Sequence, residues 1–289
     1  MITKGVIAVA GSGTRFLPAT KTMPKEMLPI VDKPIIQYVV EEMVDAGITD
    51  IIMVTRWDKK SLEDHFDRSY ALEHDLEKTG KLEKLKQIKR ISELANFIYI
   101  RQKGPYGTGT PVISAKSMIG EDEPFVFALG DDLVKSEISF TKQLIENYEK
   151  NKSMVIGVQE VLPSEVSKYG ILKVVKENEC LIVKNLIEKP TQKQAPSLLA
   201  QFGRFVLTPE IFKYLDVNKL GKDNELWLTD ALIGFIKDGG KVSAQEINNG
   251  KWFTTGDPLN FLKATVEYAL DKSDIKMEFR EYLKEVKNC

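Results

Sequence analysis

Cysteine and histidine are scarce in this chain of 289 residues, which contains only Cys180, Cys289, His65 and His74. So few residues cannot supply a disulfide framework, nor a zinc site built from clustered cysteine and histidine side chains. We expect a reducing, cytoplasmic setting, because the chain also opens on an apolar strand without the basic segment and cleavage site of a secretory signal.

Long apolar runs and an excess of one charge are also missing. No apolar run approaches the roughly 18 residues that a membrane span needs. The 41 Lys and Arg residues nearly balance the 42 Asp and Glu residues, which leaves a net charge of −1. Such a balance gives no general attraction to nucleic acid or to an anionic membrane, so we expect neither as a partner.

The beginning of the chain has the pattern of a strand, a loop, a helix and a second strand. Residues 6–10 form a short apolar run that stops at Gly11, residues 36–44 carry apolar side chains at helical spacing, and residues 51–54 are again typical of a strand. Such a unit places its loop at the carboxyl edge of a parallel sheet, where open α/β sheets bind ligands.

Strands and helices interleave along the rest of the chain. This order predicts an α/β fold with a Rossmann-like, mixed but mostly parallel sheet that is flanked by helices. The further strands are expected at residues 97–100, 125–129, 154–158, 171–175, 186–187 and 204–207, with a helix at residues 141–150.

Two segments are expected to lie outside this sheet. Residues 58–95 are highly charged, with leucine and isoleucine at helical spacing, which predicts an exposed helical excursion. From residue 258 onwards the pattern is helical again, with a polar break at residues 271–274. We therefore divide the chain into a main domain, residues 1–257, and a helical segment, residues 258–289, that packs on the domain or lies in the interface of a homodimer or homotetramer.

The loop after the first strand, residues 11–29, is the most informative segment. It lacks the Gly-Lys-[Ser/Thr] of a Walker A loop, and Phe16 stands where a dinucleotide fingerprint needs its third glycine. Small residues let backbone N–H groups approach an anion, and Arg15 and Lys25 add positive charge. This combination suits a polyphosphate; the alternative is a plain turn, but such turns usually have about 2 to 6 residues.

Two adjacent carboxylates, Asp131 and Asp132, follow the predicted strand at residues 125–129. At the carboxyl edge of the sheet they could hold Mg²⁺ against phosphate groups. Adjacent acidic residues after a buried strand are also ordinary turn residues, and this alternative stays open.

The loop resembles the signature of the sugar-1-phosphate nucleotidylyltransferases. The match is Gly-x-Gly-Thr-Arg-x-Leu-Pro-Ala-Thr-Lys over residues 11–21 and Pro-Lys-Glu-Met-Leu-Pro over residues 24–29, and it is most similar to the bacterial members that use UTP and glucose-1-phosphate. The likeness extends along nearly the whole chain, over eight later segments: His65-Phe66-Asp67, Arg101-Gln102, Asp131-Asp132, Tyr169-Gly170, Glu188-Lys189-Pro190, Ala195-Pro196-Ser197, Gly203-Arg204 and Leu228-Thr229-Asp230-Ala231. The resemblance implies a fold of the nucleotide-diphospho-sugar transferase type, with residues 1–257 as the catalytic domain.

The implied reaction is attack of a sugar-1-phosphate on the α-phosphorus of UTP, which releases pyrophosphate and forms UDP-glucose. By resemblance, Arg15 would hold the pyrophosphate, Lys25 the α-phosphate and Lys189 the sugar phosphate. The reaction needs no general base, because a sugar phosphate is already ionised near neutral pH, so we assign no catalytic role to His65 or His74.

The resemblance also implies binding residues. The backbone near the start of the loop would receive the base and the phosphates, at Ala10, Gly11, Gly13 and Thr14. The uracil edge would meet the amide of Gln102, flanked by Glu26 and Gly107. The sugar would be held by Glu188 and Lys189, with Gly170 and Gly203 allowing close approach of the backbone.

Asp131 matches the position of the family's metal aspartate, and Mg²⁺ is the expected cofactor. The related enzymes take a second carboxylate from an aspartate just before a Gly-containing pair, but here Thr254 occupies that position. Either Asp131 suffices, with phosphates and water as the remaining ligands, or Asp132 or Asp257 substitutes.

Several alternatives stay open. Thymine presents the same edge as uracil, so dTTP could replace UTP, and another hexose-1-phosphate could replace glucose-1-phosphate. The loop around Gly107 has Gly-Thr-Gly-Thr-Pro where the bacterial enzymes usually have Gly-Leu-Gly-His-Ala. A regulator that binds nucleotide sugars without catalysis is a further possibility, for which Thr254 is the best support.

Overall fold

The computed structural model describes residues 1–287, so Cys289 and the end of the 258–289 segment lie outside the described part. A nine-stranded sheet forms its centre, in the order β5-β4-β1-β6-β11-β8-β12-β10-β9. Strands β10 and β11 run opposite to the other seven, which confirms the predicted mixed, mostly parallel sheet. The strands of this sheet are β1 (Lys4–Ala8), β4 (Asp50–Thr55), β5 (Asn96–Arg101), β6 (Phe125–Leu129), β8 (Met154–Glu160), β9 (Gly170–Glu177), β10 (Cys180–Glu188), β11 (Leu199–Leu207) and β12 (Val242–Glu246).

Two short antiparallel pairs stand apart from the main sheet. They are β2 (Pro29–Ile30) with β3 (Lys33–Pro34), and β7 (Asp132–Ser136) with β13 (Gly250–Thr254). The second pair brings residues 118 positions apart together, since Trp252 lies opposite Val134 in its register. It therefore places the carboxylates after β6 beside the segment that contains Thr254.

Helices cover both faces of the sheet, as the alternation of side chains along β1 shows. Val6 belongs to the hydrophobic cluster under α5 and α7, whereas Ile7 belongs to the cluster under α1 and α6, and both are fully buried. The helices are α1 (Ile35–Asp45), α2 (Lys60–Phe66), α3 (Tyr70–Lys78), α4 (Leu82–Ser92), α5 (Gly109–Ser114), α6 (Phe140–Asn151), α7 (Leu228–Lys237), α8 (Pro258–Ala269) and α9 (Lys276–Lys287).

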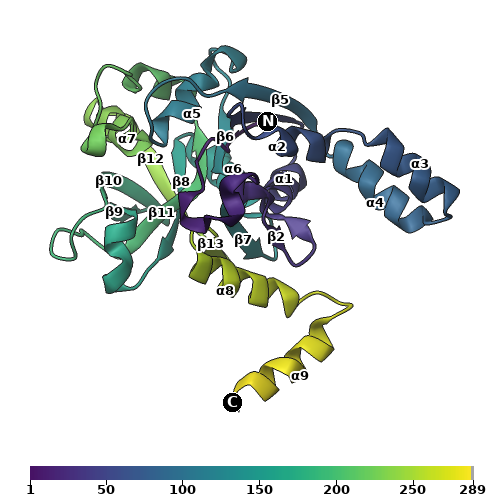
Figure 1. Cartoon of the computed structure of the whole chain (residues 1–289). Coiled ribbons are helices and arrows are strands. Elements are labelled where there is room, and N and C mark those ends of the chain that lie inside the picture. Colours follow the sequence, from purple (N-terminus) through teal and green to yellow (C-terminus); the bar gives the residue numbers. More distant parts are fainter. Residues whose placement is uncertain (288–289) are drawn as a thin grey trace.

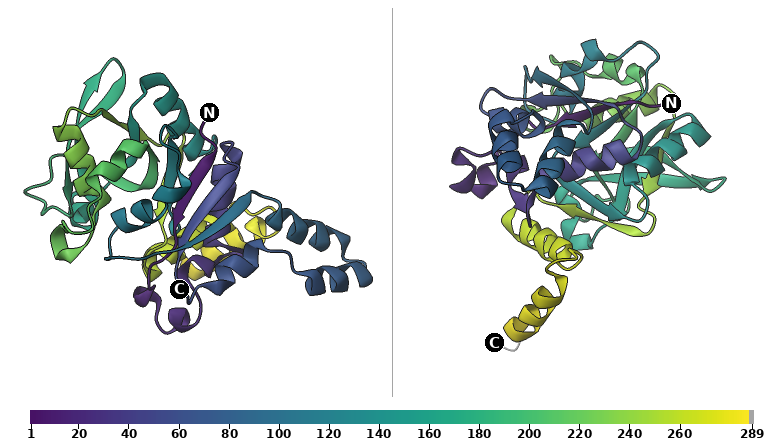
Figure 2. Two further views of the ribbon diagram at one scale, coloured as in Figure 1. Left: turned by 90° about the horizontal axis from the view of Figure 1, so that it is seen from above. Right: turned by 90° about the vertical axis from the view of Figure 1, so that its right-hand side faces the viewer.

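The charged segment 58–95 is helical, as predicted, but its first helix, α2, packs on the body through the buried Leu62 and Phe66 and is not exposed. Helices α3 and α4 project from the body as a hairpin (Figures 1 and 2). The long loop after β1 contains three short 3-10 turns that the sequence pattern did not indicate, η1 (Thr14–Phe16), η2 (Ala19–Lys21) and η3 (Lys25–Met27).

The two C-terminal helices differ in how they contact the body. Helix α8 packs on the body, where Ala264 is fully buried and the ring of Phe261 lies edge-on to that of Phe16 at 5.7 Å. Helix α9 extends away from the body (Figures 1 and 2). The boundary at residue 257 and a role of this segment in a subunit interface stay predictions. No described helix in residues 1–287 combines the length and the apolar character that crossing a bilayer requires.

Candidate active site

A pocket of about 210 Å³ lies between the end of β6, the end of β10, the middle of β11 and Arg15 of the loop after β1. The carboxyl end of β6 belongs to the edge at which open α/β sheets bind ligands, and β10 and β11, which run in the opposite direction, complete the pocket. Seven of the residues predicted from the sequence line this pocket: Arg15, Asp131, Asp132, Gly170, Glu188, Lys189 and Gly203. The sequence reasoning gave no role to Gln201, Trp227 and Trp252, and it named Tyr169 and Thr108 only within segments around predicted glycines.

Lys25 and Asp131 form an ion pair beside the pocket, with 2.5 Å between Nζ and Oδ2. Burial lowers the pKa of Lys25, but the charges of Asp131 and Glu26 outweigh it and raise this pKa above its ordinary value. Burial raises the pKa of Asp131, yet the adjacent Lys25 holds it below its usual range. Both groups are therefore charged at neutral pH.

Glu26, the next residue in η3, is paired on the opposite side. Its two carboxylate oxygens accept hydrogen bonds from Lys59 Nζ at 2.9 and 2.7 Å, and the two residues are only 1% and 3% exposed. Burial raises the pKa of Glu26 although both lysines lower it, and burial lowers the pKa of Lys59. This carboxylate is thus committed to an internal ion pair, and its predicted contact with the base stays a prediction.

Asp132 is buried, and its carboxylate binds two residues that line the pocket. Its carboxylate accepts hydrogen bonds from Gly203 N at 3.1 Å and from Trp252 Nε1 at 2.8 Å. Burial, and then the charge of Asp131, raise the pKa of Asp132 to about 6. The fully buried Arg204 donates to the carbonyl oxygen of Asp132 at 2.7 Å and is neutralised by Glu42.

The loop after β1 has a backbone that a ligand could approach closely. Gly13 has a φ of 66°, in the left-handed region, and its carbonyl oxygen accepts a hydrogen bond from Thr20 Oγ1 at 2.7 Å. Arg15 is exposed and donates to the carbonyl oxygen of Gly256 at 3.3 Å. Ala10, Gly11 and Thr14 belong to this loop but do not line the 210 Å³ pocket.

Glu188 and Lys189 follow each other at the end of β10. Thr229 Oγ1 donates to Glu188 Oε2 at 2.7 Å, and Gln201 Nε2 reaches the same oxygen at 3.3 Å. Burial raises the pKa of Glu188. The buried Oε1 of Gln201 has no hydrogen-bond partner among residues 1–287, so this wall of the pocket contains an acceptor that protein groups do not satisfy.

The two glycines predicted for the sugar site have packing roles as well. A Cβ atom on Gly170 would lie 2.3 Å from Gln201 Nε2, and one on Gly203 would lie 2.6 Å from Asp132 Oδ2. Their missing side chains therefore allow the polar groups of the pocket to reach their positions.

Gln102 and Gly107 lie at the same edge of the sheet but outside the lining of the pocket. Gln102 follows β5, and its backbone N–H donates to Thr55 O at 2.8 Å. Gly107 has a φ of 117°, and a Cβ atom there would lie 2.2 Å from Leu226 O. The loop around Gly107, whose sequence differs from the usual family loop, therefore packs against the segment before α7. Its Thr108 lines the pocket.

The acidic groups do not form a complete metal cage. Within residues 1–287 there is no cluster of three or more His, Cys, Asp or Glu side chains that could hold a metal ion. The carboxylate of Asp257 caps α8, since it accepts hydrogen bonds from Asn260 N at 3.1 Å and Asn260 Nδ2 at 2.7 Å. Both oxygens of Asp132 are also engaged, which leaves Asp131 as the best-placed carboxylate.

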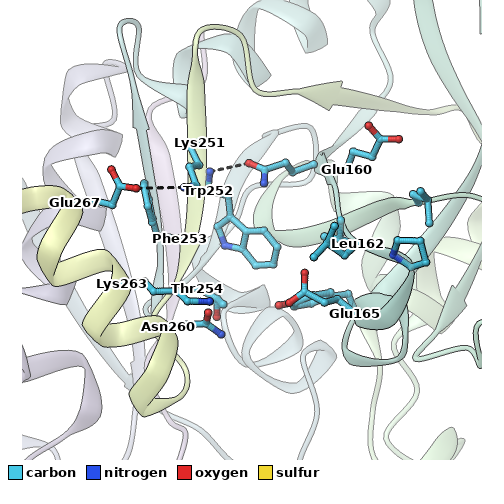
Figure 3. A pocket seen from close by; sticks show the side chains of 15 residues that line it. Glu160, Leu162, Glu165, Lys251, Trp252, Phe253, Thr254, Asn260, Lys263 and Glu267 are labelled. Atoms are coloured by element: carbon cyan, nitrogen blue, oxygen red, sulfur yellow. Dashed lines mark hydrogen bonds and ion pairs between the residues drawn. The ribbon is translucent and has the colours of Figure 1, made fainter. Parts of the chain in front are cut away.

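A larger cavity of about 520 Å³ lies next to this pocket, between β13, α8 and the segment after β8 (Figure 3). It shares Tyr169, Trp252 and Thr254 with the smaller pocket. None of the residues predicted for chemistry lines it. The charged and glycine-rich elements of the sequence therefore converge on the smaller pocket, which we take as the candidate active site.

Comparisons with known proteins show which family the chain belongs to. The chain is 47% identical over 288 residues to the UTP–glucose-1-phosphate uridylyltransferase of Bacillus subtilis (strain 168), covering 99% of this chain and 98% of that protein. A UTP-bound UGPase from Acinetobacter baumannii superposes with a TM-score of 0.89 at 38% identity, covering 99% of each chain. A UDP-glucose pyrophosphorylase complexed with UDP-glucose gives a TM-score of 0.83 at 41% identity, covering 93% of this chain and 98% of the other. The family model described as nucleotidyl transferase matches residues 4–270, and the chain belongs to this family.

Proposed function

We propose that this protein transfers a uridylyl group from UTP to glucose-1-phosphate, forming UDP-glucose and pyrophosphate. The observation that carries the proposal is the convergence of Lys25, Asp131 and the Glu188–Lys189 pair around one pocket. Two polyanions must meet in this reaction, and two relatives that are 47% and 48% identical to the chain bear the name UTP–glucose-1-phosphate uridylyltransferase. The chemistry therefore needs fixed cations rather than a strong base.

In this proposal, negative charge is neutralised by three residues, Lys25, Arg15 and Lys189. Attack by an oxygen of the sugar phosphate on the α-phosphorus of UTP displaces pyrophosphate, and negative charge builds up on the non-bridging oxygens. Lys25 stabilises the charge on the α-phosphate, Arg15 binds the departing pyrophosphate, and Lys189 holds the incoming sugar phosphate. Because Lys25 keeps its proton, it acts as a fixed charge and not as a base.

The remaining predicted residues bind and orient. The loop backbone from Ala10 to Thr14 receives the nucleotide, and Gln102 meets the uracil edge with a donor and an acceptor. Glu188, whose carboxylate is oriented by Thr229 and Gln201, accepts hydrogen bonds from sugar hydroxyls. The unsatisfied Oε1 of Gln201 lies in the same wall of the pocket.

Nucleotidyl transferases of this family generally use a divalent metal ion, and we propose Mg²⁺ with Asp131 as its protein ligand. One carboxylate oxygen of Asp131 is bound to Lys25, and no cluster of three acidic groups exists in residues 1–287. These facts fit a magnesium ion that takes most of its oxygen ligands from substrate phosphates and water. When bound, such an ion would neutralise phosphate charge beside Lys25.

The test is pyrophosphate release from UTP and glucose-1-phosphate, with and without Mg²⁺. We expect turnover with this pair only when a divalent ion is present. A panel with dTTP and other hexose-1-phosphates decides the substrate alternatives. Stabilisation by UDP-glucose in a thermal shift without turnover on any pair would indicate a non-catalytic binding protein instead.

We also propose that the protein works in the cytoplasm as a homodimer or homotetramer. The extended α9 and the exposed Leu259 and Leu262 of α8 support association of chains. Light scattering on the full chain tests this, and a monomer at micromolar concentration would contradict it.

A further inference from the structure

Lys189 lies on the face of an aromatic ring. Its Nζ is 4.5 Å from the centroid of the Trp227 ring, within the range in which the negative face of an indole attracts an ammonium group. Both residues line the 210 Å³ pocket. Of the cation–π contacts among residues 1–287, this is the one formed by a lysine of the candidate active site.

The Trp227 ring is a fixed surface. Its Nε1 donates to Lys222 O at 2.9 Å, and the residue is only 8% exposed. Trp227 also occupies the N-cap position of α7, whose first residues, Leu228 and Thr229, are buried. The orientation of the ring is therefore held by its own hydrogen bond and by the packing of its neighbours.

The backbone of Lys189 is constrained as well. Its φ is 45°, in the left-handed region that residues with a side chain rarely adopt, and its N–H donates to Tyr169 O at 3.0 Å. The backbone thus sets the direction in which the Lys189 side chain leaves β10, and the ammonium group at its end lies on the indole face of Trp227. The following turn of α7 holds the neighbouring Glu188 through Thr229.

An aromatic partner has a specific advantage for a phosphate-binding lysine. No carboxylate oxygen of residues 1–287 lies within 4.0 Å of Lys189 Nζ, in contrast to Lys25 and Lys59. A carboxylate would neutralise the ammonium and compete with an incoming phosphate. An indole face holds the ammonium in place, yet it leaves the net charge and the N–H donors available.

We propose that Trp227 is a positioning residue for Lys189, whose indole face holds the ammonium where it meets the phosphate of the sugar-1-phosphate. This inference rests on the proposed function, because it takes the role of Lys189 from there. It adds a residue to the sugar-phosphate side of the site and predicts an effect on one substrate only.

The first experiment compares W227L, which removes the ring, with W227F, which keeps an aromatic face. For W227L we expect the KM for glucose-1-phosphate to rise about 10-fold, the scale of one desolvated cation–π contact. The KM for UTP should change less than 2-fold, and W227F should lie close to the parent. W57L, at the 84% exposed Trp57, serves as the matched control and should leave both KM values unchanged.

A double-mutant cycle with K189M separates positioning from packing. If Trp227 acts through Lys189, adding W227L to K189M has little further effect on the KM for glucose-1-phosphate. The inference would be overturned if W227L raised this KM as much in the K189M background as in the parent. It would also be overturned if W227L raised the KM values for both substrates equally. An inactive parent protein on every substrate pair would instead overturn the proposed function.

A second measurement does not depend on the folding of W227L. Fluorinated tryptophans introduced at position 227 alone keep the size of the ring but withdraw electron density from its face. We expect the KM for glucose-1-phosphate to rise stepwise with the number of fluorine atoms, at constant melting temperature. A KM that is independent of fluorination would overturn the proposal.

Discussion

Replacing Lys59 by methionine removes one half of the buried Glu26–Lys59 pair and leaves a carboxylate that is 1% exposed without its main partner. Breaking a buried ion pair on one side costs about 3–5 kcal/mol. For a chain of this size, such a loss corresponds to a fall of about 6–10 °C in Tm. The neighbouring Lys60 provides the matched control, since its pair with Asp64 is 3.5 Å long and exposed, and K60M should cost less than about 0.5 kcal/mol.

The loss should also depend on pH in a defined direction. Burial already raises the pKa of Glu26, and removing the charge of Lys59 raises it further. A carboxyl group whose pKa is raised by folding contributes stability below its unfolded pKa, and this contribution is lost as the pH rises through the folded pKa. The deficit of K59M should therefore be larger at pH 8 than at pH 5.

Urea unfolding at these two pH values measures the deficit. The double variant E26Q/K59M, which carries neither charge, should recover most of the lost stability, because a buried pair gains little over neutral groups of similar size. A deficit below about 1 kcal/mol in K59M, or the same deficit at both pH values, would refute this account of the pair.

Three further predictions follow from the pocket. K25M should lower kcat for UDP-glucose formation about 100-fold, as expected when one preorganised charge is lost, and an unchanged kcat would contradict the role of Lys25. G203A should cost about 1–3 kcal/mol in urea unfolding, because its Cβ would lie 2.5 Å from that of Leu129; a variant as stable as the parent would show that the backbone yields. W252F removes a hydrogen bond to Asp132 and should cost about 1–3 kcal/mol. Because the pKa of Asp132, about 6 in the parent, should then rise, this loss is expected to be larger at pH 8 than at pH 5, and a pH-independent loss would speak against the bond.

Strands β1, β4 and β6 could be predicted because each contains a continuous apolar run buried on both faces. The runs that contain Val6, Ile52 and Phe127 all became strands of the parallel half of the sheet. Strands β7 and β13 were not predicted, because their stability comes from pairing between segments more than 100 residues apart and not from a local pattern.

The charged residues of the site were found because the loop after β1 carries a dense signature, whereas the aromatic residues were not. Trp227 stands directly before the Leu-Thr-Asp segment that carried part of the resemblance, so its place near the site could have been inferred from that neighbour. Its contact with Lys189 depends on the packing of α7 against β10, which no spacing in the sequence reveals. The buried ion pair between Glu26 and Lys59 could not be predicted for the same reason.

The projecting α3–α4 hairpin provides a place to attach reporters. Its tip is formed by Thr79 and Gly80, and a Cβ atom on Gly80 would meet no other atom within 4 Å. Exposed tips of this kind tolerate inserted peptides well, since few buried groups depend on their backbone. An epitope or a fluorophore tether inserted there would allow the protein to be immobilised or followed by fluorescence while the sheet edge stays open to its ligands.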